Sequence, residues 1–379
     1  MINRLLNLWS RIDKKSAFLF GARSVGKTYW IKQNLPTEAL YINLLKSDEF
    51  MALSNRPDLI RSMAFKKKIV VIKKKKKLPI LLDEIHNLIE ETDTRFLLTG
   101  SSARKLKKSH ANLLGGRAQI LHMYPLCSKE IVDFDLNFYL NRGGLPRVFL
   151  SADPEAEFDP YLQLYLEQEI QLESNIRNLP PFSRFLKMAA LSNGQLLSYQ
   201  SIASDVGLSA STVSEYYNIL QDTLIGFKLE PWLQSKKRKA IQTAKFYFFD
   251  IGVCSHICDR KQLTPKTKEW GDAFEHFIAL ELKAWIMYSA CRRKLYFWRN
   301  QSKHEVDFIL DNDIGIEVKA TSNVQKNHLN GLIALQEEKI TKRHIIVSLD
   351  PLERIENGIE FEPWSQFLKK LWNNEYAKK

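Results

Sequence analysis

Residues 21–28 read Gly21-Ala22-Arg23-Ser24-Val25-Gly26-Lys27-Thr28, a complete G-x-x-x-x-G-K-T motif. The motif follows the apolar run Ala17–Phe20 and opens a segment of helical character that begins at Tyr29. Glycines in such a loop allow consecutive backbone N–H groups to turn inward around phosphate oxygens, and the start of a helix adds its dipole. We expect the whole motif to bind ATP, with Lys27 at the β- and γ-phosphates and the Thr28 hydroxyl on Mg²⁺.

Short apolar runs alternate with helical stretches in the first third of the chain. The runs that we predict to be buried strands are Ala17–Phe20, Tyr41–Asn43, Pro79–Leu82 and Phe96–Thr99. The segments between them are long enough for crossover helices, so the sequence predicts an α/β domain with a parallel sheet.

Polar residues follow the third and fourth of these runs. We expect Asp83 to hold Mg²⁺ through water and Glu84 to orient and deprotonate the attacking water. The hydroxyl groups of Thr99 and Ser101 come where a nucleotide hydrolase of this kind places a sensor of the γ-phosphate. A helix N-cap at Ser101 or Ser102 is the alternative, and the two roles are compatible.

The formal charge of +13 is concentrated in the first part of the chain. Residues 1–150 contain 27 Lys and Arg against 13 Asp and Glu, whereas residues 151–379 contain 29 against 30. Eight lysines lie in Lys66–Lys68 and Lys73–Lys77. Such a run attracts nucleic acid or an anionic surface through counterion release. We favour the alternative of a solvated hairpin or helix end, because no aromatic residue interleaves with the lysines.

The expected compartment follows from the cysteines and from the apolar runs. Four cysteines are scattered along the chain, which suits a reducing compartment. No apolar run reaches the roughly 18 residues that a membrane span needs, and the N-terminus lacks the apolar core of a secretion signal. We therefore expect a cytoplasmic protein without a membrane partner.

Residues 198–220 have the pattern of a helix-turn-helix. A helix over Tyr199–Val206 is followed by Gly207 and by a second helix that Ser209 caps. The second helix exposes no Arg or Lys, so phosphate neutralisation would have to come from residues 236–239, a basic segment in the place of a wing. DNA contact and a protein-interaction or spacer role both stay open.

A second chemical pattern lies near the C-terminus. The alternating run Lys303–Leu310 carries Asp307, and after a short turn the next predicted strand carries Glu317 and Lys319. Residues two apart on a strand face the same way, so the three side chains are predicted to converge. Two carboxylates that hold Mg²⁺ and a lysine that positions water are what metal-assisted phosphodiester hydrolysis requires. A helix upstream of this pair of strands carries Glu275.

The order of the motifs resembles that in a bacterial and archaeal group of AAA-type ATPases, whose C-terminal domain is of unknown function. The motifs are GARSVGKT, LLDEIH, LLTGSS, LLGGRA with PLCSKE, and NRGGLPRV. The order D…E-x-K near the C-terminus resembles the restriction-endonuclease-like fold, which the same ATPase group carries in its C-terminal half.

The resemblance implies two further site residues. Arg117 would sense or stabilise phosphate charge, in one version across the interface of a homo-oligomer, and a structural salt bridge is the alternative. Gly144-Leu145-Pro146 would supply the G-x-P element that contacts adenine, with an ordinary turn proline at Pro146 as the alternative.

The predicted fold class is α/β, with a P-loop NTPase sheet, a helical segment, a winged helix and a restriction-endonuclease-like domain. The predicted domains are residues 1–150, 151–194, 195–265 and 266–379. The function that we expect is a Mg²⁺-dependent AAA-type ATPase whose nucleotide state controls a DNA-directed, nuclease-like C-terminal half. The alternative is a nucleotide-dependent switch that recognises a protein client through an inactive C-terminal domain.

Overall fold

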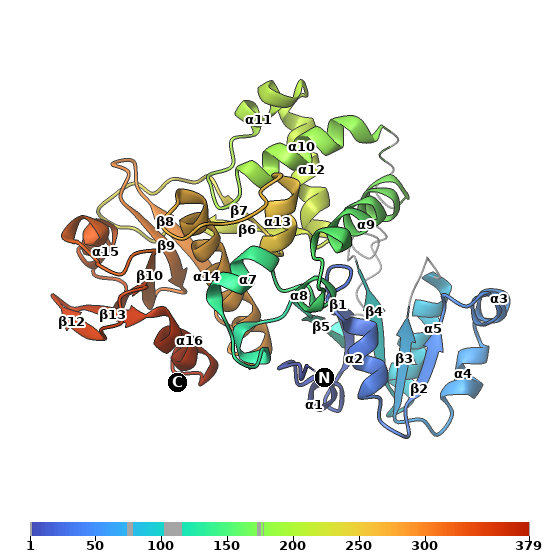
Figure 1. Cartoon of the computed structure of the whole chain (residues 1–379). Helices are drawn as coiled ribbons and strands as arrows, with labels where there is room; N and C mark the ends of the chain where they lie inside the picture. The colour runs from blue at the N-terminus through green and yellow to red at the C-terminus, as the bar shows by residue number, and fades with distance from the viewer. Residues whose placement is uncertain (1, 74–78, 102–115, 173–175, 177, 379) are drawn as a thin grey trace. The chain divides into compact units, whose positions relative to one another are not determined.

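The computed structural model describes residues 2–73, 79–101, 116–172, 176 and 178–378 (Figure 1). The chain divides into two units, one formed by Met1–Pro125 with Asp222–Leu224, the other by Leu126–Gln221 and Ile225–Lys379. The segments predicted over 151–194, 195–265 and 266–379 therefore fall largely into one unit, and their boundaries stay predictions.

The first unit contains a five-stranded parallel sheet in the order β2-β3-β4-β1-β5. Its strands are β1 (Ser16–Phe20), β2 (Leu40–Asn43), β3 (Ile69–Lys73), β4 (Arg95–Gly100) and β5 (Ala118–His122). Its helices are α1 (Leu8–Ile12), α2 (Lys27–Gln33), α3 (Ser47–Asn55), α4 (Leu59–Ala64) and α5 (Pro79–Glu91). The predicted parallel α/β sheet is confirmed, and three of the four predicted strands are present as β1, β2 and β4.

The prediction of a strand over Pro79–Leu82 is wrong, because these residues form the first turn of helix α5. Proline is favoured at the start of a helix, and the buried Leu81, Ile85 and Leu88 repeat at helical spacing. The strand in this part of the sheet is β3, which is rich in β-branched residues. The crossover that parallel neighbours require between β3 and β4 is then supplied by α5.

The second unit begins with helices. They are η2 (Ser128–Glu130), α7 (Leu136–Arg142), α8 (Pro146–Leu150), α9 (Glu155–Tyr165), η3 (Leu166–Leu172), α10 (Leu179–Leu191), α11 (Tyr199–Val206) and α12 (Ala210–Asp222). The helix-turn-helix elements are confirmed: Gly207 adopts a left-handed conformation with φ of 68°, and the Ser209 hydroxyl accepts the N–H of Thr212 at 3.1 Å. Val213 and Tyr217 on α12 point into the core, as their spacing predicts.

The basic segment 236–239 does not stand free as the wing of a DNA-binding module. It lies between β6 (Gly226–Pro231) and β7 (Lys245–Phe248), which pair antiparallel. The backbone N–H groups of Lys236 and Lys237 donate to the buried carboxylate of Glu338 at 2.7 and 2.8 Å. Much of this loop is therefore bound to the C-terminal part of the same unit.

A mixed eight-stranded sheet, β12-β13-β11-β10-β9-β8-β6-β7, forms the rest of the second unit. Its further strands are β8 (Leu295–Arg299), β9 (Glu305–Leu310), β10 (Ile314–Lys319), β11 (Arg343–Ser348), β12 (Arg354–Glu356) and β13 (Ile359–Pro363). The accompanying helices are α13 (Ile251–Ile257), α14 (Lys268–Ser289), η4 (Lys326–Leu329), α15 (Asn330–Gln336) and α16 (Trp364–Trp372). Apolar side chains fill both faces: Ile345 and Val347 belong to the cluster around α14 and α16, whereas Ile346 belongs to that around α15.

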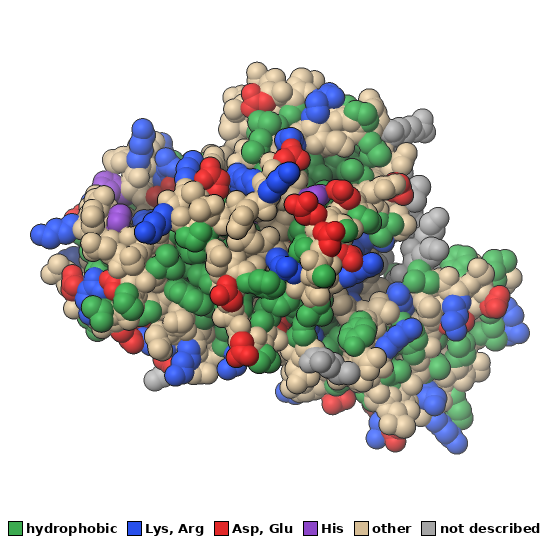
Figure 2. Space-filling view, viewed as in Figure 1, with side chains coloured by type: hydrophobic (Ala, Val, Ile, Leu, Met, Phe, Trp, Pro, Cys, Tyr) green, Lys and Arg blue, Asp and Glu red, His purple; other side chains and the backbone are tan. Residues whose placement is uncertain are grey.

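Charged side chains of both signs are intermixed on the described surface of the face drawn in Figure 2. Of the lysine runs singled out in the sequence, Lys66–Lys68 precede β3; Lys66 and Lys68 are exposed, Lys67 is half-buried, and Lys68 Nζ lies 3.6 Å from Glu38. This matches the solvated alternative for these three residues. Lys74–Lys77 lie outside the described residues.

Candidate functional site

The loop between β1 and α2 has the backbone shape that its glycines allow. Gly26 has φ of 93° and Ser24 has φ of 62°, so the chain turns sharply before α2 begins at Lys27. Gly21 lies against the segment after β5, and a Cβ atom there would come within 2.4 Å of the carbonyl oxygen of Met123. Glycine is therefore required at position 21 for the loop to pack on the sheet.

The ammonium of Lys27 lies against the beginning of the same loop. Its Nζ donates to the carbonyl oxygens of Gly21 at 2.6 Å and of Ala22 at 2.8 Å. A phosphate that binds in the loop has to compete with these two carbonyl oxygens for the Lys27 ammonium. Because an ammonium has three N–H donors, Lys27 can bind the phosphate and still keep a hydrogen bond to a carbonyl. Thr28 follows in the first turn of α2, and its role as a Mg²⁺ ligand stays a prediction.

Arg4 supports this loop and was missed in the sequence. Its Nη1 donates to the carbonyl of Val25 at 2.9 Å, and its Nη2 donates to Tyr124 at 2.5 Å and to Pro125 at 3.3 Å. One guanidinium thus joins the loop to the chain after β5. No motif contains Arg4, so only the folded chain identifies this contact.

Thr99 is on β4 and Ser101 follows that strand, and their roles toward the γ-phosphate stay predictions. Strands β1 and β4 are parallel neighbours with Phe20 opposite Gly100, so the chain leaves both strands at the same edge of the sheet. Ligands of open parallel sheets bind outside this carboxyl edge. Ser102 lies outside the described residues.

Asp83 and Glu84 lie on α5 and not at the end of a strand. Asp83 is exposed, and Glu84 Oε2 accepts a hydrogen bond of 2.9 Å from Nε of Arg61 on α4. Their assignment to Mg²⁺ and to the attacking water rested on a strand that the structure replaces by a helix. These two roles stay predictions, without support from this geometry.

The two residues implied by the resemblance lie in different units. Arg117, just before β5, forms an ion pair with Glu90 of α5 and keeps 42% of its side chain exposed. Pro146 begins α8, and the preceding Gly144 donates its N–H to the buried carboxylate of Asp250 at 2.7 Å. The structure thus gives each segment a structural contact, and their roles toward the nucleotide stay predictions.

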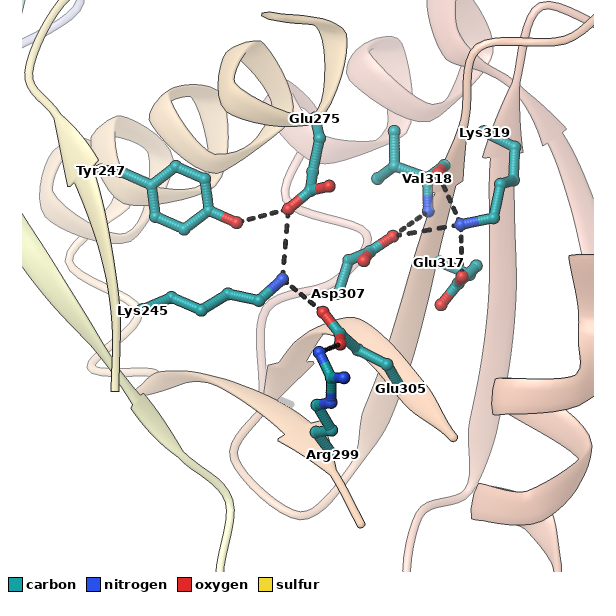
Figure 3. Close-up of polar contacts among 9 residues, drawn as sticks. All are labelled: Lys245, Tyr247, Glu275, Arg299, Glu305, Asp307, Glu317, Val318 and Lys319. Atoms are coloured by element: carbon teal, nitrogen blue, oxygen red, sulfur yellow. Dashed lines mark hydrogen bonds and ion pairs between the residues drawn. The ribbon is translucent and has the colours of Figure 1, made fainter. Parts of the chain in front are cut away.

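The three C-terminal residues singled out in the sequence do converge (Figure 3). Lys319 Nζ lies 2.5 Å from Glu317 Oε1 and 3.8 Å from Asp307 Oδ2, so one ammonium bridges the two carboxylates. Asp307 Oδ2 also accepts the N–H of Val318 at 2.8 Å, which fixes β9 to β10 at this point. Asp307 and Glu317 are only 5% and 6% exposed, because both faces of the sheet are covered.

The donor set at these carboxylates fits a divalent cation in part. Glu317 Oε2 is buried and has no hydrogen-bond partner among the described residues. Burial, together with the charge of Asp307, raises the pKa of Glu317 to about 8, although the neighbouring Lys319 ammonium acts in the opposite direction. Mg²⁺ commonly uses one or two protein carboxylates with water and substrate phosphate. Across the described chain, no three His, Cys, Asp or Glu side chains group as a complete metal site would.

A second set of charged residues adjoins the first and was not assigned from the sequence (Figure 3). Lys245 of β7, only 3% exposed, lies 3.4 Å from Glu275 of α14 and 2.6 Å from Glu305 of β9. The Tyr247 hydroxyl donates to Glu275 at 2.5 Å. Burial alone would lower the pKa of Lys245, but the surrounding carboxylates, Glu275 first, hold it well above its ordinary value. Lys245 is therefore a fixed buried cation.

The sheet order, the loop between β1 and α2, and the polar residues at the carboxyl edge define a P-loop type of nucleotide-binding α/β domain. Three family models match the chain in succession: an AAA domain over residues 13–132, a domain of unknown function (DUF8612) over 133–264, and a domain of unknown function (DUF4143) over 270–367. The chain thus combines an N-terminal AAA domain with a C-terminal DUF4143 domain.

Similar curated proteins are uncharacterized. One from Mycobacterium tuberculosis is 25% identical over 281 residues, which cover 71% of this chain and 63% of that protein. One from Methanocaldococcus jannaschii is 23% identical, over 94% of this chain and 85% of the relative. The chain therefore spans less than two thirds of the mycobacterial relative's length.

Among solved structures, the Aeropyrum pernix ORC1 protein in complex with DNA matches at 11% identity, covering 65% of this chain and 86% of that one. Its TM-score of 0.26 does not establish a common fold. Within the described part of the chain, every helix is too short or too polar to cross a bilayer.

Proposed function

We propose that this protein is a Mg²⁺-dependent ATPase whose nucleotide state controls a C-terminal half that cleaves or binds DNA. The ATP site consists of the loop over residues 21–28, with Thr99 and Ser101 beside it. The DNA-directed site consists of Asp307, Glu317 and Lys319. The observation that carries this second part is the convergence of two buried carboxylates and one ammonium at neighbouring strands of one sheet.

Each residue of the C-terminal cluster has a chemical task in this proposal. Glu317, through its unpartnered Oε2, and Asp307 would hold a divalent cation, which supplies Lewis-acid stabilisation of a phosphodiester when bound. Lys319 would orient the attacking water and stabilise the charge that develops on the phosphate oxygens. Asp307 is itself oriented by the N–H of Val318, so its carboxylate is positioned before any ligand arrives.

A switch with an inactive C-terminal domain is a second candidate, and one observation favours it. Lys319 bridges Asp307 and Glu317 in the position where a cation would otherwise balance their charge. In this version the cluster stabilises the fold, as buried ion pairs can, and the nucleotide state of the first unit governs recognition of a protein client.

Two assays on the full chain separate the candidates. Nicking of supercoiled DNA in Mg²⁺ or Mn²⁺ should appear with the natural protein and disappear with Asp307→Asn, while the exposed-site control Glu353→Gln keeps it. ATP turnover should rise when DNA is added. Nicking that survives Asp307→Asn would locate the activity elsewhere, and turnover indifferent to DNA together with no nicking would favour the switch.

A further inference from the structure

Glu305 is held by two cations, one on each of its carboxylate oxygens. Lys245 Nζ lies 2.6 Å from Oε1, and Arg299 Nη1 donates to Oε2 at 2.8 Å (Figure 3). Each partner comes from a different strand, Lys245 from β7 and Arg299 from β8. Proteins hold phosphate groups in the same way, with separate cationic side chains on different oxygens of the anion.

The clamped carboxylate lines a cleft next to the proposed catalytic cluster. The cleft has a volume of about 330 Å³ and is lined by residues 193–196 and by the side chains of Lys245, Asp272, Glu275, Arg299 and Glu305. Glu305 lies two residues before Asp307 on β9, so the cleft borders the cluster along this strand. A group bound there would be adjacent to the carboxylates Asp307 and Glu317.

The cations of the cleft have unused capacity for an anion. Arg299 Nε is buried and has no hydrogen-bond partner among the described residues. Lys245 is held in place by burial, so it cannot follow Glu305 into solvent.

We propose that Lys245 and Arg299 form a phosphate subsite of the C-terminal domain, and that Glu305 is an internal substitute for the ligand in the structure. The ligand is a phosphate group of a nucleic-acid strand, which displaces the Glu305 carboxylate and so places the neighbouring phosphodiester at Asp307 and Glu317. This inference rests on the proposed action on DNA, but it concerns binding and does not require that the cluster cleave.

The test measures binding by calorimetry with inorganic phosphate and, separately, with a short oligothymidine. All proteins carry Lys27→Ala, so that any residual binding at the first unit is the same in each. Glu305→Gln removes the competing charge, and we expect it to tighten binding of both ligands about tenfold, since a like charge at a binding site is strongly unfavourable. Arg299→Gln should weaken binding at least about tenfold. Arg299→Lys should weaken it less, because lysine keeps the positive charge but lacks the planar set of N–H donors of the guanidinium.

The results decide the proposal even if one variant is unstable. Should Glu305→Gln fail to fold, the pair Arg299→Gln and Arg299→Lys still tests the subsite. Binding that none of these substitutions changes would overturn the inference, and free phosphate bound as tightly as the oligonucleotide would overturn its assignment to nucleic acid. Nicking abolished by Asp307→Asn without the expected binding pattern would reject the subsite alone. The expected pattern without nicking would support the subsite and reject the nuclease.

Discussion

The carboxylate of Asp250 accepts the backbone N–H of Gly144 at 2.7 Å, although 106 residues separate the two in sequence. Its other oxygen accepts the N–H of Val253 at 2.9 Å and so caps helix α13. Asp250 is fully buried, and the close packing of Gly143 against it leaves no room for a Cβ atom there. One carboxylate therefore joins the NRGGLPRV segment to α13.

Replacing Asp250 by Ala should destabilise the second unit. The N–H groups of Gly144 and Val253 would be left buried without acceptors, and we expect the free energy of unfolding to fall by about 2–4 kcal/mol. Urea unfolding measures this, with Asp205→Ala on the exposed side of α11 as the control, for which we expect stability close to that of the natural protein. Equal effects of the two substitutions would contradict the role of Asp250.

Lys27→Ala should greatly weaken ATP binding, because it removes one of the two cationic side chains of the motif, the one that we expect at the β- and γ-phosphates. Arg23 is the other. We expect a loss of affinity of at least about tenfold, which corresponds to about 1.4 kcal/mol. Titration with a fluorescent ATP analogue measures it. Lys32→Ala, on the exposed side of the same helix, is the control, and unchanged affinity in Lys27→Ala would remove the basis of the nucleotide site.

Glu84→Gln tests whether the general-base role survives the placement of Glu84 on a helix. If Glu84 is the base, ATP turnover should fall at least about a hundredfold while ATP binding is kept. Glu91→Gln is a matched control, because Glu91 lies on the same helix and also accepts from Arg61, at 2.5 Å. Small and equal effects of the two changes would mean that both carboxylates only hold Arg61.

Glu281 should make stability depend on pH. It accepts the N–H of Ser128 at 2.7 Å and the indole N–H of Trp372 at 2.7 Å, yet burial raises its pKa to about 7 from an ordinary 4.5. The folded state then keeps its proton to higher pH than the unfolded state, so this group lowers the free energy of unfolding as pH rises from about 5 to about 7, by up to about 3 kcal/mol.

Glu281→Gln removes this titration and isolates it from other groups. We expect the natural protein to lose stability toward urea relative to Glu281→Gln between about pH 5 and about pH 7. The difference between the two proteins is the quantity to follow, because Asp250, whose pKa burial raises to about 6, contributes equally to both. Parallel pH profiles would contradict the shift at Glu281.

Local patterns in the sequence predicted the parts of the site that a short segment forms by itself. Residues 21–28 specify a turn that needs glycine. The two helices around Gly207 follow from the Ser209 cap and from apolar residues repeated at helical spacing. Asp307 and Glu317 converge because alternate residues on paired strands share a face. The strand at Pro79–Leu82 failed because a short apolar run is equally compatible with a buried helix, and the need for a crossover between β3 and β4 favoured the helix.

The sequence alone was therefore sufficient for the glycine turn of residues 21–28, the α/β class and the convergence of Asp307 and Glu317, since these depend on backbone geometry over a few residues. The folded chain added what depends on residues far apart. In the folded chain Arg4 donates to the loop, Glu84 pairs with Arg61, and Lys245 of β7 lies beside Glu275 and Glu305. Burial and charge balance are properties of the packed core, because they arise from every segment that surrounds a group and not from its neighbours in sequence.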